Sequence, residues 1–376
     1  MAISSDAHRP LHQYYYYFIF MIYCLLCFTV TMIGASNNRN KVSALYVFGD
    51  STVDPGNNNY IRTAFKSNFE PYGRDFANQV PTGRFTNGKL GTDFIASYLG
   101  LKEFLPPYLD PNLTNQELIT GVSFASAGSG YDPLTPTLSN VISIGKQLEH
   151  FKEYKKRLER ILGKQKIEDH MKNAIFFISA GTNDFVINYF TLPIRRKTYS
   201  LIAYHHFLLQ HVQNFIQELL REGARKLGVV GLPPMGCLPI MITFNSNNAL
   251  LERGCVDMFS SAARNHNLIL QNQLNLVQLN SSMSTGAKIY YVDIYEPLSN
   301  MIHGLDDNNN NGGFDEVDSG CCGSGYIEAA FLCNRASHLC SDASKYVFWD
   351  SIHPTEKAYY NMYLTSRHVI DALVTA

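Results

Sequence analysis

The sequence lacks an excess of charge of either sign. Its 376 residues include 31 basic and 32 acidic side chains, and only 17% of all residues are charged. Proteins that bind nucleic acid or an anionic membrane surface through their overall field carry a basic patch or run. No block of lysine or arginine stands out here. The composition therefore argues against such partners, and function must be sought in local chemistry.

Three familiar site motifs are also missing. The sequence contains no HExxH zinc-protease motif, no Walker A phosphate loop and no GxSxG nucleophile elbow. His205, His206 and His211 fall on a predicted helix without a cysteine or carboxylate at metal-ligand spacing, so we interpret them as structural. A zinc protease, a P-loop enzyme and a standard nucleophile-elbow hydrolase therefore have no support, and we expect neither a metal nor an organic cofactor.

Long hydrophobic runs are absent except near the start of the chain. Residues 14–34 carry no charged side chain and end in small residues, after a short segment with histidine and arginine. This order predicts a signal peptide over residues 1–35 and a secreted, extracellular protein. An uncleaved anchor is the alternative, because a run of about 20 residues can span a membrane. We expect residues 36–376 to form a single domain with one large core.

Six cysteines lie beyond that segment. They are Cys237, Cys255, Cys321, Cys322, Cys333 and Cys340. An even number in an exported protein favours disulfides over a zinc site, but many pairings are possible and the sequence does not choose among them. The sequons at Asn112 and Asn280 are candidate glycosylation sites, which agrees with export.

Short apolar runs alternate with longer helical patterns in the rest of the chain. The runs cover residues 44–48, 122–125, 174–179, 227–232 and 288–293. Helical spacing of apolar residues is clear over 148–162 and 201–219. This alternation is typical of a mainly parallel sheet with helices on both faces, which is a three-layer α/β/α sandwich. Residues 55–111, rich in glycine, proline and asparagine, predict a long loop region with a short helix near 94–99.

Ser51 follows the first apolar run and a glycine. A serine on a turn at the carboxyl edge of a parallel sheet can present its hydroxyl as a nucleophile. Near the other end of the chain, Asp350 and His353 stand three residues apart, before a predicted helix over 355–374. At that spacing a carboxylate can accept the histidine Nδ1 proton while Nε2 accepts a proton from a hydroxyl. The alternative is that Asp350 caps the helix and His353 is a surface residue.

Gly128 and Asn183 each follow a predicted strand. Gly128 can turn its backbone N–H toward the serine without a Cβ in the way, and Asn183 can add a side-chain amide donor. Both residue types are also common in ordinary turns. The pair is therefore a candidate oxyanion hole, to be weighed together with Ser51.

Six motifs in this order resemble the GDSL lipase/esterase family, also called SGNH hydrolases, and in particular its secreted plant branch. They cover residues 48–58, 71–76, 81–89, 181–184, 321–323 and 348–355, within a resemblance that extends over nearly all of the chain after residue 43. The resemblance implies a flavodoxin-like α/β/α fold with Ser51 as nucleophile, His353 as base and Asp350 as its orienter. It also implies an oxyanion hole from the Ser51 and Gly128 N–H groups and the Asn183 amide.

The resemblance further implies a serine esterase or lipase that hydrolyses a small-molecule ester or lipid without a cofactor. An acyltransferase using the same site, an acetyl-polysaccharide esterase and a non-catalytic wall or lipid binding protein are the alternatives. One departure is Ser123, where relatives usually have asparagine, which bears on the local geometry near Gly128.

Residues 307–318 carry a second, weaker pattern. Their oxygen-bearing side chains fall at the ligand spacing of an EF-hand calcium loop, at Asp307, Asn309, Asn311, Asp315 and Asp318. The last position is aspartate instead of the usual glutamate, and a cysteine pair follows where a helix should begin. An asparagine-rich loop explains the same residues, so we expect no metal here and keep calcium as the alternative.

Overall fold

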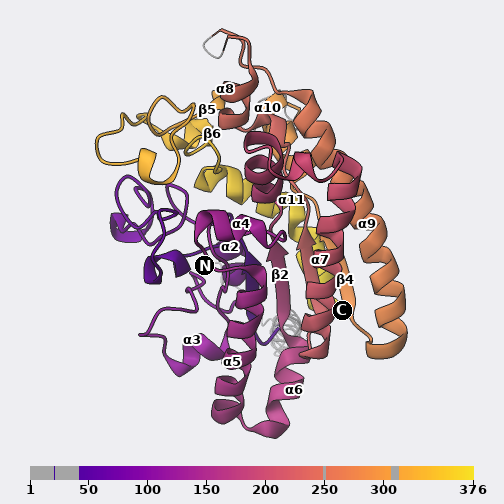
Figure 1. Cartoon of the computed structure of the whole chain (residues 1–376). Helices are drawn as coiled ribbons and strands as arrows, with labels where there is room; N and C mark the ends of the chain where they lie inside the picture. The colour runs from indigo at the N-terminus through magenta and orange to yellow at the C-terminus, as the bar shows by residue number, and fades with distance from the viewer. Residues whose placement is uncertain (1–20, 22–41, 249–250, 306–312) are drawn as a thin grey trace, which may run out of the picture. The chain divides into compact units, whose positions relative to one another are not determined.

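Four parallel strands form the central sheet of the computed structural model, which describes residues 21, 42–248, 251–305 and 313–376 (Figure 1). The strands are β1 (Leu45–Gly49), β2 (Ile175–Ser179), β3 (Lys226–Val230) and β4 (Lys288–Val292), adjacent in that order. Leu45 pairs with Ile175, which in turn pairs with Lys226. Aromatic and β-branched residues dominate three of the strands and suit a sheet that is covered on both faces.

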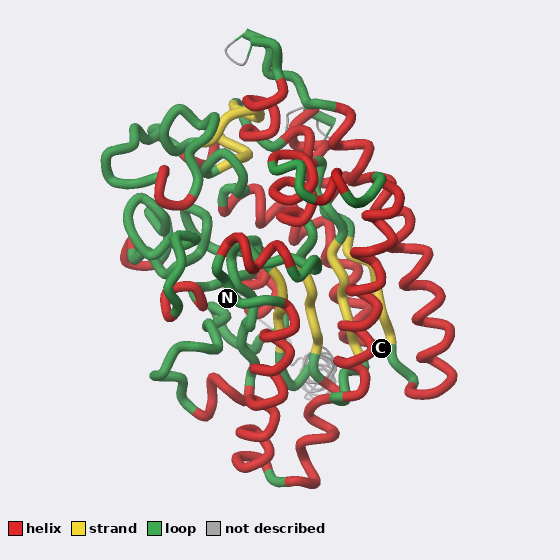
Figure 2. Tube along the Cα trace, viewed as in Figure 1, coloured by secondary structure: helices red, strands yellow, loops and turns green. Residues whose placement is uncertain are grey.

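Helices cover both faces of this sheet, as the red helices around the yellow strands show (Figure 2). Side chains alternate along β1, so Tyr46 and Phe48 pack on one face while Leu45 and Val47 pack on the other. The first face is covered by α5 (Ile144–Leu162), α7 (Leu201–Arg221) and α9 (Asp257–Thr285). The second is covered by α2 (Gly91–Tyr98) and α11 (Glu356–Thr375). The predicted three-layer fold is confirmed.

The predicted strand at 122–125 is the exception, because it is reduced to an isolated bridge. Its backbone runs beside β1, with the Phe124 N–H donating to the Val47 carbonyl at 2.7 Å. On its other side it meets Pro106 and Pro107, and a proline has no N–H to donate to a ladder. The run therefore extends the edge of the sheet without forming a full strand.

A second, two-stranded parallel sheet was not predicted. It pairs β5 (Glu316–Gly320) with β6 (Tyr346–Phe348). Two disulfides, Cys321–Cys340 and Cys322–Cys333, tie the loop between these strands, and Cys237–Cys255 forms a third. The expectation of disulfides is confirmed, and the structure supplies the pairing that the sequence left open.

The remaining helical elements are short. They are α3 (Asn115–Ile119), α4 (Leu134–Ser139), α6 (Lys164–Asn173), α8 (Pro239–Asn245), α10 (Tyr295–His303) and a π-helical turn over Asp184–Thr191. Single 3₁₀ turns cover Asn57–Tyr60, Ala77–Gln79, Arg195–Lys197, Met235–Cys237, Ala330–Leu332 and Ala343–Lys345. Within the described ranges, no helix combines the length and the apolar character that crossing a membrane requires.

The predicted signal peptide lies outside the described residues apart from Met21, and the first three calcium-loop positions, Asp307, Asn309 and Asn311, lie outside them too. Of the other two positions, Asp315 pairs with Lys345 at 3.2 Å and Asp318 pairs with Arg253 at 3.1 Å. Asp318 belongs to β5, where an EF-hand would have a helix.

The two glycosylation sequons lie in different settings. Asn112 is exposed in the loop before α3, and Asn280 belongs to α9, where the structure does not describe its side chain. Glycosylation at either residue stays a prediction.

Candidate active site

Ser51 lies on a turn directly after β1. Gly49 ends the strand at φ 143°, and a Cβ there would lie 1.8 Å from the carbonyl oxygen of Ser179. Only glycine allows β1 to approach the end of β2 this closely. The Gln147 side chain of α5 also fixes Gly49, accepting from the Gly49 N–H and donating to the Gly49 carbonyl, both at 2.9 Å. The serine is therefore held at the carboxyl edge of the sheet.

His353 connects Ser51 with Asp350. Its Nε2 lies 2.8 Å from the Ser51 Oγ, and its Nδ1 lies 2.9 Å and 2.8 Å from the two carboxylate oxygens of Asp350. Ser51 is 8% exposed, His353 5% and Asp350 0%. With Nδ1–H donating to the carboxylate, Nε2 is free to accept the serine proton. The structure thus brings together all three predicted residues, although 302 positions separate the serine from the histidine.

The Asp350–His353 loop is held by its own backbone. One Asp350 oxygen accepts the N–H groups of Ile352 at 2.9 Å and His353 at 2.8 Å, and the Trp349 N–H donates to the His353 carbonyl at 2.7 Å. The N-cap of α11 is Thr355, whose hydroxyl accepts the Ala358 N–H. Asp350 therefore orients the imidazole and does not cap the helix.

Tyr72 is a residue of this site that sequence reasoning missed. Its hydroxyl donates to the second Asp350 oxygen at 2.7 Å and accepts the Ala330 N–H at 2.9 Å. The side chain is fully buried, and that burial, followed by the nearby Asp350 charge, raises the pKa of Tyr72 well above its usual value. Tyr72 stands in the 71–76 motif, but no spacing rule connects that segment with Asp350.

Gly128 lies on a loop beside the Ser51 turn. The Ser126 N–H donates to the Gly49 carbonyl at 3.0 Å, which fixes this loop against the end of β1. Gly128 has a φ of 83°, a conformation that glycine adopts without strain. Within the described ranges, neither the Ser51 N–H nor the Gly128 N–H donates to another protein group. Both amides are available to a bound oxygen.

Asp54 links the two loops. One carboxylate oxygen accepts the Ala127 N–H at 2.9 Å, and the other accepts the N–H groups of Gly56 at 2.8 Å and Asn57 at 2.7 Å. Burial raises the pKa of Asp54 to about 6, while the hydrogen bonds act in the opposite direction. The segment after Ser51 and the segment before Gly128 are thus fixed to one buried side chain.

Ser123 adds a second link between the same segments. Its hydroxyl donates to the Val53 carbonyl at 2.8 Å and accepts the Ala125 N–H at 3.2 Å. Serine in place of the usual asparagine therefore still ties the run beside β1 to the residues that follow Ser51.

Asn183 and Asp184 hold the other end of the Gly128 loop. The Asn183 amide donates to the Ser129 carbonyl at 2.9 Å. The Asp184 carboxylate accepts the N–H groups of Tyr131 at 2.8 Å and Asp132 at 3.2 Å. Burial raises the pKa of Asp184 to about 7. Asn183 also lines the pocket that Ser51 lines, so its amide lies at the same edge as the two free N–H groups.

One group of side chains elsewhere has ligand-like proximity, but it does not suit a metal. Among the described residues it consists of Cys237, Cys255 and His303. The two cysteines are joined in a disulfide and offer no thiolate.

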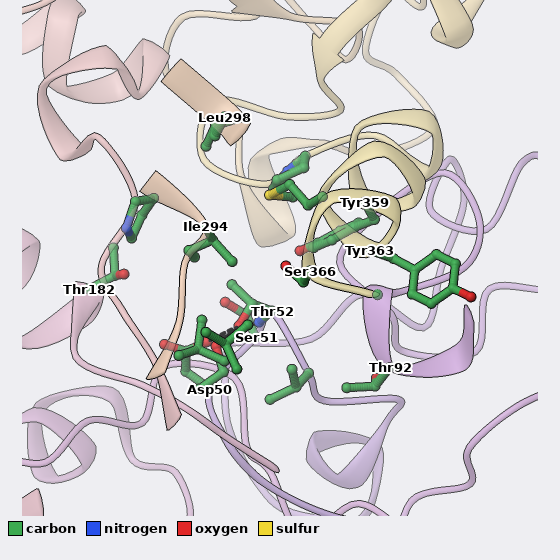
Figure 3. Close-up of a pocket in the computed structure, with 18 of the residues that line it drawn as sticks. Asp50, Ser51, Thr52, Thr92, Thr182, Ile294, Leu298, Tyr359, Tyr363 and Ser366 are labelled. Atoms are coloured by element: carbon green, nitrogen blue, oxygen red, sulfur yellow. Dashed lines mark hydrogen bonds between the residues drawn. The ribbon is translucent and has the colours of Figure 1, made fainter. Parts of the chain in front are cut away.

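Ser51 lines an apolar pocket whose other walls come mainly from the sheet, α2 and α11 (Figure 3). Its walls include Phe177 of β2, Val230 of β3 and Ile95 of α2. The hydrogen-bonded serine, histidine and aspartate at the carboxyl edge of a parallel sheet, with the serine in the lining of this pocket, have the geometry of a serine hydrolase.

Comparison with known proteins identifies the family. Residues 45–364 match the family model described as GDSL-like Lipase/Acylhydrolase, so the chain belongs to that family. The Arabidopsis thaliana protein GDSL esterase/lipase At5g45960 is 59% identical over 336 residues, covering 89% of this chain and 88% of the relative. GDSL esterase/lipase At1g06990 of the same plant is 44% identical, with 91% and 94% covered. The chain is a carboxylic-ester hydrolase, as the resemblance implied.

Proposed function

We propose that this chain is a secreted serine esterase or lipase that cleaves carboxylic esters through an acyl-enzyme on Ser51. The observation that carries the proposal is the continuous hydrogen-bond chain from the Ser51 hydroxyl through His353 to Asp350. Such a chain supplies a nucleophile, a base and a group that orients the base.

In the first step, the Ser51 Oγ attacks the ester carbonyl carbon while its proton passes to the His353 Nε2. The carbonyl π bond becomes a lone pair on the oxygen, which gives a tetrahedral oxyanion. Asp350 accepts the Nδ1–H throughout and stabilises the imidazolium that forms. The Tyr72 hydroxyl donates to the same Asp350 oxygen, so the carboxylate keeps its orientation.

The oxyanion is stabilised by donors at the pocket mouth. The Ser51 and Gly128 N–H groups and the Asn183 amide are the donors that we assign to it. Their positions are fixed before substrate binds, because Asp54, Asp184 and Gln147 anchor the loops that carry them. Donors that need no rearrangement stabilise the developing charge most effectively.

The intermediate then collapses. The bond from carbon to the alcohol oxygen breaks, the proton on Nε2 passes to the leaving alkoxide, and the acyl group remains on the Ser51 Oγ. Water next gives a proton to Nε2 and attacks the acyl carbon, and the second collapse returns the proton to Ser51 and releases the acid. An alcohol in place of water would give acyl transfer, and acetylated polysaccharide remains a possible substrate for the same groups.

Export is part of this proposal. Three disulfides are expected in an oxidising compartment and are rare in the cytosol. The signal-like segment over residues 1–35 supports the same location.

The proposal is tested with a series of chromogenic esters from acetyl to palmitoyl, using purified wild type and Ser51→Ala. Turnover by the wild type and none above background by Ser51→Ala is the expected result. The neighbouring Thr52→Ser variant keeps a hydroxyl in the same turn and serves as the matched control. Equal turnover by wild type and Ser51→Ala would remove Ser51 from the mechanism.

A further inference from the structure

The pocket beside Ser51 contains a buried tyrosine hydroxyl that has no partner. Tyr359 of α11 is 5% exposed, and its oxygen has no hydrogen-bond partner among the described residues. Figure 3 shows this hydroxyl pointing inward, beside Ser366, whereas the ring of Tyr363 points away from Ser51. A polar group that is buried without a partner is costly, and native proteins seldom keep one without a use.

Three other hydroxyls that line the pocket already have hydrogen-bond partners. The Thr52 hydroxyl donates to Asp50 at 2.8 Å and lies 2.9 Å from the Ser179 hydroxyl. The Ser366 hydroxyl donates to the Asp293 carbonyl at 3.4 Å. Burial raises the pKa of Tyr359 well above its usual value, so its hydroxyl stays protonated and can donate. The Tyr359 hydroxyl can therefore donate a hydrogen bond to a group bound in the pocket.

The walls that surround this donor are apolar. They come from three strands of the sheet and from α2, α10 and α11. They include Phe177, Val230, Val292, Ile95, Leu298 and Met362. Walls of this kind fit an aliphatic chain, because they offer dispersion contacts and exclude water. A single donor within them fits one oxygen atom on that chain.

The half of the substrate that we assign to this apolar pocket is the acyl half, a step that depends on the proposed acyl-enzyme. The acyl carbon stays bonded to Ser51 while the alcohol must leave and water must enter. An apolar pocket that Ser51 lines can hold the part that remains, whereas the alcohol and water need a path to solvent.

We propose that the pocket binds an aliphatic acyl chain that carries an oxygen function, preferably a hydroxyl, which hydrogen-bonds to Tyr359. An unsubstituted chain leaves the tyrosine hydroxyl unpaired in the complex. Sites that hydrogen-bond a substrate hydroxyl discriminate against analogues that lack it, because a buried group then stays unpaired.

The test compares dodecanoyl esters with the positional isomers of hydroxydodecanoyl esters of the same alcohol. For at least one isomer, wild type should have a higher kcat/KM than for the unsubstituted ester. In Tyr359→Phe the ratio of these two values should fall about 5- to 10-fold, the value of one neutral hydrogen bond. Tyr360→Phe, which removes an exposed hydroxyl from the next residue of the same helix, should leave the ratio unchanged.

A second measurement is independent of turnover. Because the hydroxyl has no partner, Tyr359→Phe should leave the melting temperature unchanged or raise it. A large loss of thermal stability would contradict the proposal, since it would mean that the hydroxyl bonds to the protein.

The outcomes also separate this proposal from the function on which it depends. If Ser51→Ala loses activity but no hydroxylated isomer is preferred, or Tyr359→Phe leaves the ratio unchanged, the oxygen-binding subsite is wrong and the esterase mechanism stands. If Ser51→Ala keeps activity on every ester, the mechanism itself is wrong.

Discussion

The two sides of the candidate site are held by different means. On the oxyanion side, buried carboxylates at Asp54 and Asp184 collect backbone N–H groups from several loops. On the base side, two disulfides tie the chain between β5 and β6, and the hydroxyl of Tyr72 holds Asp350. Hydrogen bonds to a buried carboxylate aim N–H groups, whereas a disulfide constrains the loop that it closes. The difference teaches that each side can be disturbed separately.

Removing Asn183 should have the largest effect of the three changes that probe this difference. Asn183→Ala loses one oxyanion donor and the hydrogen bond to the Ser129 carbonyl. We expect kcat to fall roughly 10²- to 10³-fold, as it does when other hydrolases lose one oxyanion donor. Steady-state kinetics with a chromogenic ester measure the change in kcat. A melting curve shows whether the variant is folded. Asn173→Ala, at the exposed last residue of α6, is the control, and near-normal kcat in Asn183→Ala would remove Asn183 from the oxyanion hole.

Removing the Tyr72 hydroxyl disturbs the base side and should have a smaller effect. Tyr72→Phe leaves the His353 contacts of Asp350 in place but removes the tyrosine hydrogen bond to its second oxygen. We expect kcat to fall about tenfold with little change in KM, because a hydrogen bond to a charged group is lost away from the substrate. Tyr60→Phe, an exposed tyrosine of the same loop region, is the control. A rise in KM with unchanged kcat would place Tyr72 in substrate binding instead.

Acid should lower the free energy of unfolding through a pair of buried histidines that pack against Phe185. His205 of α7 and His266 of α9 meet Nδ1 to Nδ1 at 3.2 Å, and the Phe185 ring lies 5.1 Å and 5.4 Å from their rings. Burial lowers the pKa of His205 to about 4 and that of His266 to about 3. At acidic pH the unfolded chain therefore binds more protons at these histidines than the folded chain does. As a result, stability falls as pH drops below about 6.5.

The size of this effect is modest. Each imidazole can contribute up to about 1.4 kcal/mol per pH unit within that window. The raised pKa values of Asp54 and Asp184 act with the opposite sign, since those carboxylates lose stabilisation as pH rises. Comparing melting temperatures of wild type and His266→Gln between pH 4 and about 6.5 isolates the histidine contribution. The variant should show the flatter profile, and parallel profiles would contradict the assignment.

Much of this fold could be predicted because its signals are local. Apolar runs identified the four strands of the main sheet, and helical spacing identified α5 and α7. The run at 122–125 failed as a strand because its neighbour Pro106 cannot donate, a contact that no local pattern reveals. The β5–β6 sheet was missed for the opposite reason, since Glu316–Gly320 alternates without an apolar face.

The residues of the candidate site also divide into those that local sequence patterns predict and those that they do not. Ser51, Asp350 and His353 were predicted from short motifs, and the structure places them in one hydrogen-bond chain. Tyr72 and Tyr359 were missed because their roles depend on contacts between distant segments. For Tyr359 the informative signal is the absence of a partner within the described ranges, which only a folded structure can give.

The central claim is that Ser51 carries the acyl group between the two halves of the reaction. The most direct measurement is rapid quenching of the enzyme with a slowly hydrolysed ester, followed by intact-mass analysis and peptide mapping. The account predicts one added acyl group, located on Ser51, which forms and decays at rates compatible with turnover. Turnover with the acyl group on another residue, or with no acylated enzyme while deacylation is rate-limiting, would contradict it.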